Sequence, residues 1–325
     1  MPFWGNTMKV KLMVSQGFLH RLEHPGESEI NLERYRSFRD VFGSGDFGLV
    51  LAGDVLAESH GGERANCYTL DSGLRPIEHQ RSGVRSDLFL ASGFETARRE
   101  IPSREDLVSI LSYVERAKRG GIIGDLVNSE EATLYEDKWT SISELEGNGV
   151  RTPRTYHFSE LSAAETFIRD RPEEHYIVKH RFGENGVGIS RIGAENMEDL
   201  PENISDYIFQ EEMDIVDERR VIASCGEVLG GRIITDRTRP WERIATAGRK
   251  HSVDPHTPTE GEVRDTLRVF DDLGAILGCV DWVTLRDGSS CFLEFNGVGT
   301  GYGYSGGVYD LNEAVAESLK AKYLN

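Results

Sequence analysis

Short apolar runs alternate with longer amphipathic segments along most of this 325-residue chain. Apolar runs of about four to eight residues between turn-forming residues are typical of strands, and apolar residues spaced about three or four apart are typical of helices. In the first third, strands are predicted at residues 10–14, 47–51 and 86–91, and helices at residues 29–41 and 103–119. The glycine-, serine- and arginine-rich stretches 61–64 and 74–85 are interpreted as long loops. This alternation predicts a small α/β domain.

The same alternation continues to the end of the chain. Strands are predicted at residues 122–128, directly after Thr152-Pro153, and at 176–180, 189–192, 207–211, 220–223 and 227–235. Helices are predicted at residues 159–170, 261–277 and 311–323, and a helical stretch that starts near Ser129 carries Lys138. The polar, arginine-rich segment 236–256 has no regular period and is predicted to be a loop. The whole chain is therefore predicted to be a mixed α/β protein.

The apolar runs 278–285 and 291–295 flank Asp287-Gly288, which is a strong signal for a hairpin. A two-residue loop would place Asp281 directly opposite Glu294, about 5 Å away. A four-residue loop would shift the pairing but keep the same face, whereas a three-residue loop would separate the two side chains. The hairpin therefore predicts facing carboxylates only for loops of even length.

Asn296 points the same way as Glu294 because side chains alternate along a strand. Two facing carboxylates repel each other unless a cation lies between them. A hard divalent cation with oxygen ligands, above all magnesium that carries nucleotide phosphates, would explain Asp281, Glu294 and Asn296 on one face. The alternative interpretation is a solvated hairpin edge.

A glycine-rich loop, Gly183-Glu184-Asn185-Gly186-Val187-Gly188, connects the predicted strands 176–180 and 189–192. It lacks the Gly-Lys-Ser/Thr ending of a P-loop, and it does not open a helix as a dinucleotide fingerprint does. A glycine loop between two strands is typical of a flap whose backbone amides cover nucleotide phosphates, although it is also typical of a simple turn. Lys179 lies in the strand directly before the loop, where its ammonium group could reach phosphate oxygens. Lys138 is a second candidate, with a solvated helix face as its alternative.

The composition limits the classes of partner. The formal charge of −18 argues against sequence-independent nucleic-acid binding, which needs a basic surface. No apolar run approaches membrane-spanning length, and no export signal is recognised at the N-terminus. Four cysteines without metal or redox spacing indicate free thiols in a reducing compartment. We therefore expect a cytoplasmic protein that binds no nucleic acid and no membrane.

Taken in order, several segments resemble the ATP-grasp superfamily, in particular the branch of glutathione synthetase and the ribosomal-protein glutamate ligase. The matching segments are Asn128-Ser129 to Asp137-Lys138, Gly149-Val150 with Thr152-Pro153, Ile177-Val178-Lys179 with the glycine loop, Phe209-Gln210-Glu211, Arg220-Val221-Ile222, Val280-Asp281-Trp282 and Glu294-Phe295-Asn296. The resemblance covers residues 126–325. It implies an ATP-grasp fold with an N-terminal α/β domain on the substrate side (1–125), a central lid subdomain (126–203) and a C-terminal subdomain with the metal site (204–325).

The resemblance also implies roles for individual residues. Lys138, Lys179 and the loop residues Gly183, Glu184, Gly186 and Gly188 would contact ATP phosphates. Residues Gln210, Glu211, Glu212 and Met213 would form the strand edge that meets adenine, and Asp217 or Glu218 would bind the ribose hydroxyls. Asp281, Glu294 and Asn296 would hold one or two Mg²⁺ ions, with Mn²⁺ as a substitute. Arg220 and Arg232 would face the γ-phosphate and the acyl group, with a surface ion pair as the alternative interpretation.

For activity, the resemblance implies an ATP- and Mg²⁺-dependent carboxylate-amine ligase that forms an amide through an acyl phosphate. Its substrates would be an amino acid, a small peptide or a peptide tail, and a homodimer is expected from the branch. One alternative is an ATP-grasp kinase that phosphorylates a hydroxyl, with His251 or His256 as the base. Another is a non-catalytic ATP-binding module.

The chain departs from the pattern of this branch in two loops. Segment 241–249 lacks the asparagine of the usual Arg-x-Asn, and segment 297–304 is a glycine-tyrosine loop without the usual proline. Both loops fall where the acyl substrate is expected. The departures therefore concern the identity of the substrates more than ATP binding.

Overall fold

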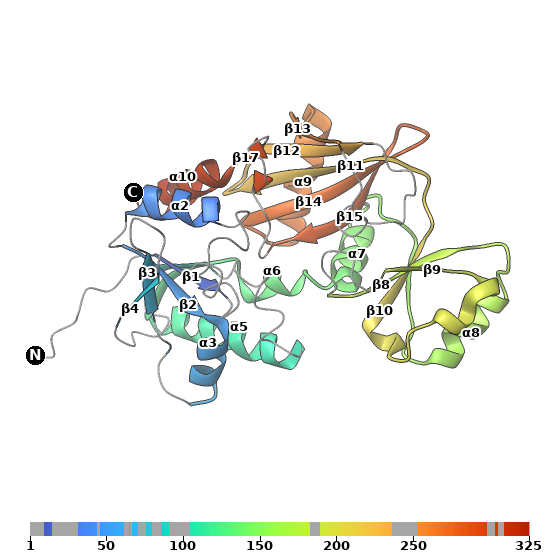
Figure 1. Ribbon diagram of the computed structural model, residues 1–325, viewed down its shortest axis with the longest axis horizontal. Helices are drawn as coiled ribbons and strands as arrows, with labels where there is room; N and C mark the ends of the chain where they lie inside the picture. The colour runs from blue at the N-terminus through green and yellow to red at the C-terminus, as the bar shows by residue number, and fades with distance from the viewer. Residues whose placement is uncertain are drawn as a thin grey trace, which may run out of the picture.

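A computed structural model of the chain describes residues 10–14, 32–43, 46–61, 65, 67–70, 76–79, 86–90, 104–182, 189–235, 252–297, 303–304 and 309–324. Within these ranges the chain forms three sheets flanked by helices, and a two-stranded ribbon of β16 (Gly303–Tyr304) and β17 (Tyr309–Asp310). Figure 1 shows the N-terminal part at the lower left, the central part at the right and the C-terminal part at the top. The predicted mixed α/β architecture is confirmed.

The N-terminal sheet has the strand order β4-β3-β2-β1-β5-β6. Its strands are β1 (Val10–Val14), β2 (Phe47–Leu51), β3 (Cys67–Leu70), β4 (Pro76–His79), β5 (Ser86–Leu90) and β6 (Ile123–Val127). Strands β2, β1, β5 and β6 run parallel, whereas β3 and β4 are antiparallel additions at one edge. The parallel strands are covered on both faces, which explains their continuous apolar runs.

Three helices cover this sheet: α2 (Leu32–Phe42), α3 (Ala52–Ser59) and α5 (Arg104–Arg119). The prediction of a loop at 74–85 is wrong, because β4 lies inside it. Backbone pairing with β3 stabilises this short strand, and Pro76 occupies its first position, where an edge strand tolerates proline. Helix α3 was not predicted either.

The central sheet has the antiparallel order β7-β10-β8-β9. Its strands are β7 (Thr155–His157), β8 (Tyr176–His180), β9 (Ser190–Ile192) and β10 (Tyr207–Glu211). Helix α8 (Leu161–Arg169) packs Ala164 and Ile168 against Val178 and Phe209 of the sheet. The short 3-10 helices η1 (Ala194–Asp199) and η2 (Ile204–Asp206) lead from β9 into β10.

The C-terminal sheet has the antiparallel order β13-β12-β11-β14-β15. Its strands are β11 (Ile215–Ser224), β12 (Glu227–Thr235), β13 (Ser252–His256), β14 (Leu277–Leu285) and β15 (Ser290–Asn296). One face carries α7 (Lys138–Gly147) and α9 (Glu260–Asp272), whereas α10 (Asn312–Tyr323) packs on the other face. Both faces of this sheet are therefore covered by helices, so the polar side chains that are buried on them need a specific explanation.

The largest differences from the prediction in this part concern β13, β11 and α9. Strand β13 lies inside the segment 236–256 that was predicted to be a loop, because pairing with β12 overrides its polar sequence. Strand β11 begins at Ile215 instead of residue 220. Helix α9 ends at Asp272 instead of residue 277, since Gly274 takes a left-handed φ of 61° that stops the helix before β14.

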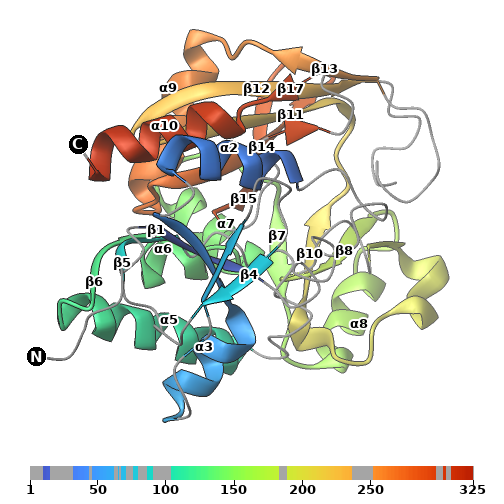
Figure 2. The ribbon, with the colours of Figure 1, turned by 60° about the vertical axis from the view of Figure 1, so that its left-hand side comes forward.

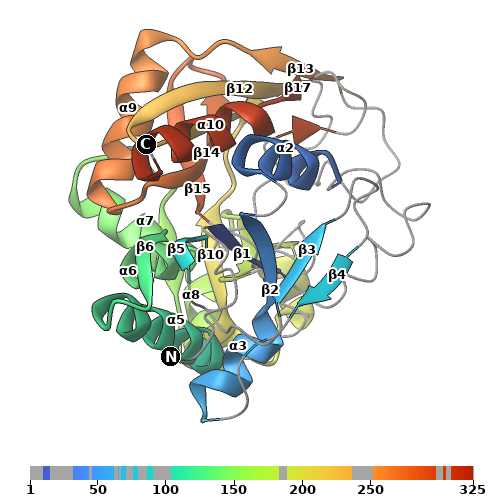
Figure 3. The ribbon, with the colours of Figure 1, turned by 90° about the vertical axis from the view of Figure 1, so that its left-hand side faces the viewer.

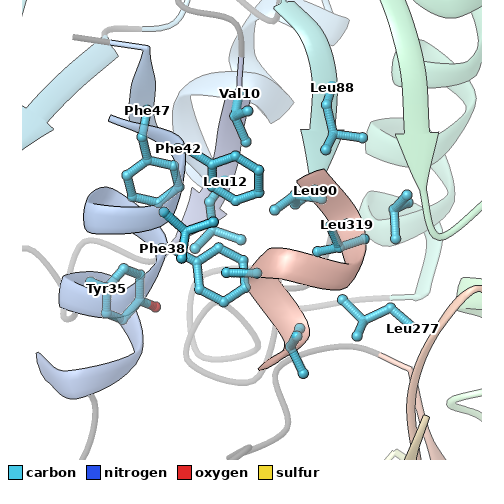
Figure 4. Close-up of a cluster of buried hydrophobic side chains, with 14 of the residues drawn as sticks. Val10, Leu12, Tyr35, Phe38, Phe42, Phe47, Leu88, Leu90, Leu277 and Leu319 are labelled. Atoms are coloured by element: carbon cyan, nitrogen blue, oxygen red, sulfur yellow. The ribbon is translucent and has the colours of Figure 1, made fainter. Parts of the chain in front are cut away.

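One apolar core joins the N-terminal and C-terminal parts. Helices α2 and α10 lie side by side in Figures 2 and 3, and Lys320 of α10 donates a hydrogen bond to the carbonyl of Val41 at 2.7 Å. Figure 4 shows Phe38 of α2 and Leu319 of α10 in the same cluster as Leu277 of β14. The two parts therefore pack as one body on this face of the C-terminal sheet.

Two strands lie in sheets on the other side of, or across, the predicted subdomain boundaries at residues 125 and 203. Strand β6, which ends at Val127, belongs to the N-terminal sheet, and β10 belongs to the central sheet although it follows residue 203.

Helix α6 (Glu130–Leu134) begins where expected, with the Ser129 hydroxyl as its N-cap. In the described part of the chain, none of the helices is long and apolar enough to cross a membrane.

Candidate active site

The β14–β15 hairpin places Asp281 directly opposite Glu294, which confirms the predicted pairing. The loop, however, has three residues, the length for which the sequence predicted that the two side chains would be separated. The Leu285 amide bonds to the Ser289 carbonyl at 2.9 Å, so three residues form the turn, with Gly288 at a φ of 81°. A bulge in β15 between the partners of Asp281 and Trp282 then shifts the register and restores the facing carboxylates.

Asn296 completes the predicted triad of oxygen-bearing side chains. Its amide nitrogen lies 3.2 Å from Asp281 Oδ2 and 3.3 Å from Glu294 Oε1. Among the described residues, no group of three His, Cys, Asp or Glu side chains is arranged to hold a metal ion. The third side chain here is an amide, whose oxygen is also a ligand for hard cations, so the donor set of two carboxylates and one amide fits magnesium.

Two lysines from different elements converge on Glu294. Lys138, the first residue of α7, places Nζ 3.4 Å from Glu294 Oε2, and both Lys138 and Lys179 of β8 are only 7% exposed. Burial, and then the neighbouring charge of Lys138, lowers the pKa of Lys179 to about 8. The solvated-helix interpretation of Lys138 is therefore wrong.

The two carboxylates respond oppositely to this environment. Burial raises the pKa of Asp281 to about 6 although Arg220 opposes the shift. Burial also acts to raise the pKa of Glu294, but the charges of Lys138 and Lys179 outweigh it and hold that pKa well below its usual range. Glu294 is therefore ionised at neutral pH, whereas the ionisation of Asp281 costs free energy of folding.

Arg220 and Arg232 lie opposite each other on β11 and β12, on the same face as Asp281. The Nε and Nη2 atoms of Arg220 donate to the two oxygens of Asp281 at 2.7 and 2.6 Å. Burial, and then the charge of Arg220, lowers the pKa of Arg232. The interpretation of these arginines as a surface ion pair does not hold for Arg220, whose pair with Asp281 is largely buried.

The predicted adenine segment, 210–213, begins at the end of β10 and continues beyond it. Residues 208–210 pair with β7 on one side and with β8 on the other, so only the part after Gln210 lacks strand pairing on at least one side. Gln210 is buried and donates to the Thr155 hydroxyl at 3.2 Å. Beyond it the carboxylates of Glu211 and Glu212 bind Arg154 and Arg191, and the Met213 carbonyl accepts from the Ile215 amide.

The two ribose candidates point in opposite directions. Glu218 is buried on the face of Arg220, and its charge raises the pKa values of Lys179 and Asp281. Asp217 accepts from the Thr284 hydroxyl and pairs with Arg219 on the face covered by α9. Only Glu218 therefore joins the cluster.

Several predicted residues lie outside the described residues or away from the cluster. Outside the described residues lie Gly183, Glu184, Gly186, Gly188, His251 and most of the substrate loops 236–256 and 297–307. His256 lies opposite Gly231, on the α9 face, where its Nε2 contacts Glu262 at 3.0 Å. His256 is therefore not placed to act as a base beside Arg220 or Arg232.

Three polar residues for which the sequence predicted no role organise the cluster. The Asn128 amide donates to the carbonyls of Leu277 and Gly297 at 2.7 and 2.8 Å, and its oxygen accepts from the amides of Ile276 and Leu277 at 2.8 and 2.9 Å. It thereby fastens both ends of the hairpin that carries Asp281 and Glu294.

The other two residues, Asp137 and Arg181, form a buried ion pair beside the lysines. The N-cap position of Asp137 before α7 could have been recognised from sequence, because aspartate commonly starts a helix. No local signal marks the pairing with Arg181, which comes from another sheet.

The chain matches no protein-family model and no curated protein sequence. Its structure resembles that of the ATP-grasp ligase PsnB in complex with a minimal precursor, at a TM-score of 0.63 and 15% identity, over 97% of this chain and 99% of the other. It also resembles the D-cycloserine synthetase DcsG at a TM-score of 0.64 and 14% identity, over 97% and 100% of the two chains. The D-Ala:D-Ser ligase VanG from Enterococcus faecalis gives a TM-score of 0.61 at 13% identity, over 98% and 100% of the two chains. These likenesses cover nearly the whole chain and concern the fold.

Proposed function

The chain has the ATP-grasp fold, and from this premise we propose that it is an ATP-dependent carboxylate-amine ligase of the peptide- or amide-forming kind. One observation carries the proposal. Three segments far apart in sequence bring Lys138, Lys179 and the Asp281–Glu294 pair together in a buried cluster. A cluster of this kind is costly to keep unless it binds a charged ligand, since buried charges lose their hydration.

In this proposal the cations of the cluster bind the phosphates of ATP. Lys138 and Lys179 would bind phosphate oxygens, and Glu218 would accept hydrogen bonds from ribose hydroxyls. Asp281, Glu294 and Asn296 would hold Mg²⁺, which supplies Lewis-acid stabilisation of the β- and γ-phosphate charge when it is bound. A solved structure of PsnB contains Mg and ADP, which supports the same pairing of nucleotide and metal for this chain.

The two arginines would serve the chemical step. A substrate carboxylate oxygen attacks the γ-phosphorus, the bond to ADP breaks, and an acyl phosphate forms. An amine then attacks the acyl carbon, phosphate leaves, and the amine loses a proton to solvent. Arg220 and Arg232 would stabilise the charge that develops on the transferred phosphoryl group and on the acyl oxygen. No side-chain nucleophile is required.

The nature of the substrates is a further part of the proposal. The structures of PsnB and MdnC contain precursor peptides, whereas DcsG is named a D-cycloserine synthetase and VanG a D-Ala:D-Ser ligase. These neighbours support an amino acid, a small peptide or a peptide tail as the acid or the amine. The glutathione synthetase branch, a homodimer and a cytoplasmic location remain predictions.

The kinase alternative gains no support from the described residues. Its nominated base His256 lies on the face opposite the arginines and contacts Glu262. A non-catalytic module would have no need to keep the metal triad together with the buried lysines.

The direct test is ADP and phosphate release from Mg-ATP across a panel of amino acids and peptides, singly and in pairs, with mass spectrometry of each mixture. Phosphate release that depends on a pair, with a product mass equal to both reactants less water, is the expected result. A phosphorylated product would instead identify a kinase, and ATP binding without turnover in any mixture would favour the non-catalytic module.

A further inference from the structure

Asp137 and Arg181 form a buried ion pair between α7 and the end of β8. The side chain of Asp137 is 1% exposed and that of Arg181 15%. Arg181 Nε donates to Asp137 Oδ1 at 2.9 Å and Nη2 donates to Oδ2, so the guanidinium group grips both carboxylate oxygens. Burial raises the pKa of Asp137, but the hydrogen bonds and charge of Arg181 outweigh it, so the net pKa is lowered and the pair is fully charged at neutral pH.

Each member of the pair lies next to one of the two site lysines. Asp137 immediately precedes Lys138, and Arg181 follows Lys179 by two residues. A backbone hydrogen bond of 3.1 Å from the Lys138 amide to the Arg181 carbonyl joins the same two segments. The Arg181 amide is itself fixed by the Asp206 carbonyl at 2.8 Å.

The segments joined in this way carry charges that repel. Lys138 and Lys179 both approach Glu294, and the charge of Lys138 contributes to lowering the pKa of Lys179. Acidic neighbours such as Glu294 offset part of this repulsion. A link outside the cluster would keep the two ammonium groups at a spacing suited to one polyphosphate before any anion binds.

We infer that the Asp137–Arg181 pair is a positioning device that holds Lys138 and Lys179 at the spacing required to bind the phosphates of ATP. The inference rests on the proposed function, because it assigns both lysines to phosphate. In this inference neither Asp137 nor Arg181 contacts the nucleotide. The expected effect of the pair is on phosphate affinity, with little effect on the rate at saturating ATP.

The test compares ATP binding by the wild-type protein with binding by Asp137→Asn, Arg181→Gln and the double variant, using calorimetric titration. Asparagine is as good an N-cap as aspartate, so Asp137→Asn removes the charge and keeps the start of α7. Each single variant is expected to raise the Kd for ATP and for inorganic tripolyphosphate about tenfold. The double variant should be no worse than either single one, and Arg181→Lys, which keeps the charge, should be intermediate.

The stoichiometry of binding separates this role from a structural one. Partial misfolding lowers the fraction of protein that binds, whereas mispositioned lysines raise the Kd at unchanged stoichiometry. Asp214 and Arg286 provide a matched control, because they form another bidentate pair between distant segments but are exposed. Asp214→Asn and Arg286→Gln should change the Kd by less than about twofold.

Two outcomes would overturn the inference while leaving the proposed function in place. One is an ATP Kd that stays within about twofold of wild type in both Asp137→Asn and Arg181→Gln. The other is an equal rise in the control variants. Failure of the wild-type protein to bind ATP would overturn the proposed function and this inference together.

Discussion

Arg219 and Arg220 are neighbours in β11, yet they point to opposite faces of the C-terminal sheet and bind different carboxylates. On the α9 face, Arg219 binds Glu262, which also accepts from the Thr259 amide and hydroxyl at 2.7 and 2.8 Å. On the other face, Arg220 binds Asp281, beside Glu294. The two faces thus repeat one kind of ion pair in two environments.

The pKa values distinguish the two pairs. Burial acts to raise the pKa of Glu262, but the hydrogen bonds from Thr259 and the charge of Arg219 outweigh it, so the net pKa is lowered. For Asp281 burial prevails and the pKa rises to about 6. A carboxylate whose pKa is lowered stabilises the fold, whereas a carboxylate whose pKa is raised is held ionised at the expense of stability. Glu262 on the α9 face therefore serves the fold, and Asp281 on the opposite face is suited to binding and chemistry.

The largest expected effect is that of Glu294→Ala on turnover. Removal of this carboxylate takes away a metal ligand and the partner of Lys138, so Mg-dependent turnover should fall by at least about 10³-fold. The circular dichroism spectrum should stay close to that of the wild type, whereas the Tm should fall because Lys138 and Lys179 lose a counter-charge. Glu144→Ala, on the exposed face of α7, is the control for a lost surface carboxylate, and substantial activity in Glu294→Ala would exclude the metal assignment.

A matched pair of isosteric variants tests the two faces against each other. Asp281→Asn should lower kcat about 10²- to 10³-fold, yet keep the free energy of unfolding within about 1 kcal/mol, because it relieves a strained charge. Glu262→Gln should keep most of the activity of the folded protein but lower the free energy of unfolding by about 3 kcal/mol, because it leaves Arg219 without its buried charge partner. Urea unfolding and initial rates, measured on both variants, check this; the comparison fails if the two variants exchange their effects.

Lys179→Ala should raise the ATP Kd by about 10- to 100-fold, the loss expected for one charge-assisted contact to phosphate. The pKa of about 8 adds a pH dependence. Lys179 loses its proton as the pH rises through 8, so the ATP affinity of the wild type should fall above this pH. The variant, which lacks the group, should not show this fall in a titration from pH 6.5 to pH 9. An ATP Kd that does not change on substitution would remove Lys179 from the phosphate site.

The smallest expected effect is the acid dependence of stability that comes from Glu262. Its pKa is lowered in the folded state, so its contribution is complete above the pKa of the unfolded chain and is lost as the pH falls through the folded-state pKa. The wild-type protein and Glu262→Gln should therefore differ in stability at pH 7 and converge towards pH 3. Urea midpoints measured at several pH values test this; parallel curves at all pH values would assign the stability to packing instead of charge.

The sequence predicted those parts of the site that depend on local patterns. Alternation along β15 placed Glu294 and Asn296 together. Lys179 was conspicuous because lysine is scarce in this chain and this one lies inside an apolar strand. The bulge that restores the Asp281–Glu294 pairing was not predictable, because no glycine or proline marks it. The same holds for β4 and β13, which owe their strand conformation to neighbouring strands.

Long-range pairing explains the remaining differences. The Asp137–Arg181 contact joins residues that are distant in sequence, and the choice between Asp217 and Glu218 depends on the orientation of β11 within the sheet. Neither is encoded by a local motif. Tertiary structure was needed to divide the charged residues into those that serve the fold and those that serve the site.

The most direct test of the proposed ligase activity is oxygen-isotope transfer from the acid substrate. With the substrate pair found in the panel, the acid would be labelled with ¹⁸O in its carboxylate, and the released phosphate would be analysed by mass spectrometry. An acyl-phosphate route predicts one ¹⁸O atom in each phosphate. Phosphate without label would show that the carboxylate does not attack the γ-phosphorus, and would contradict the account.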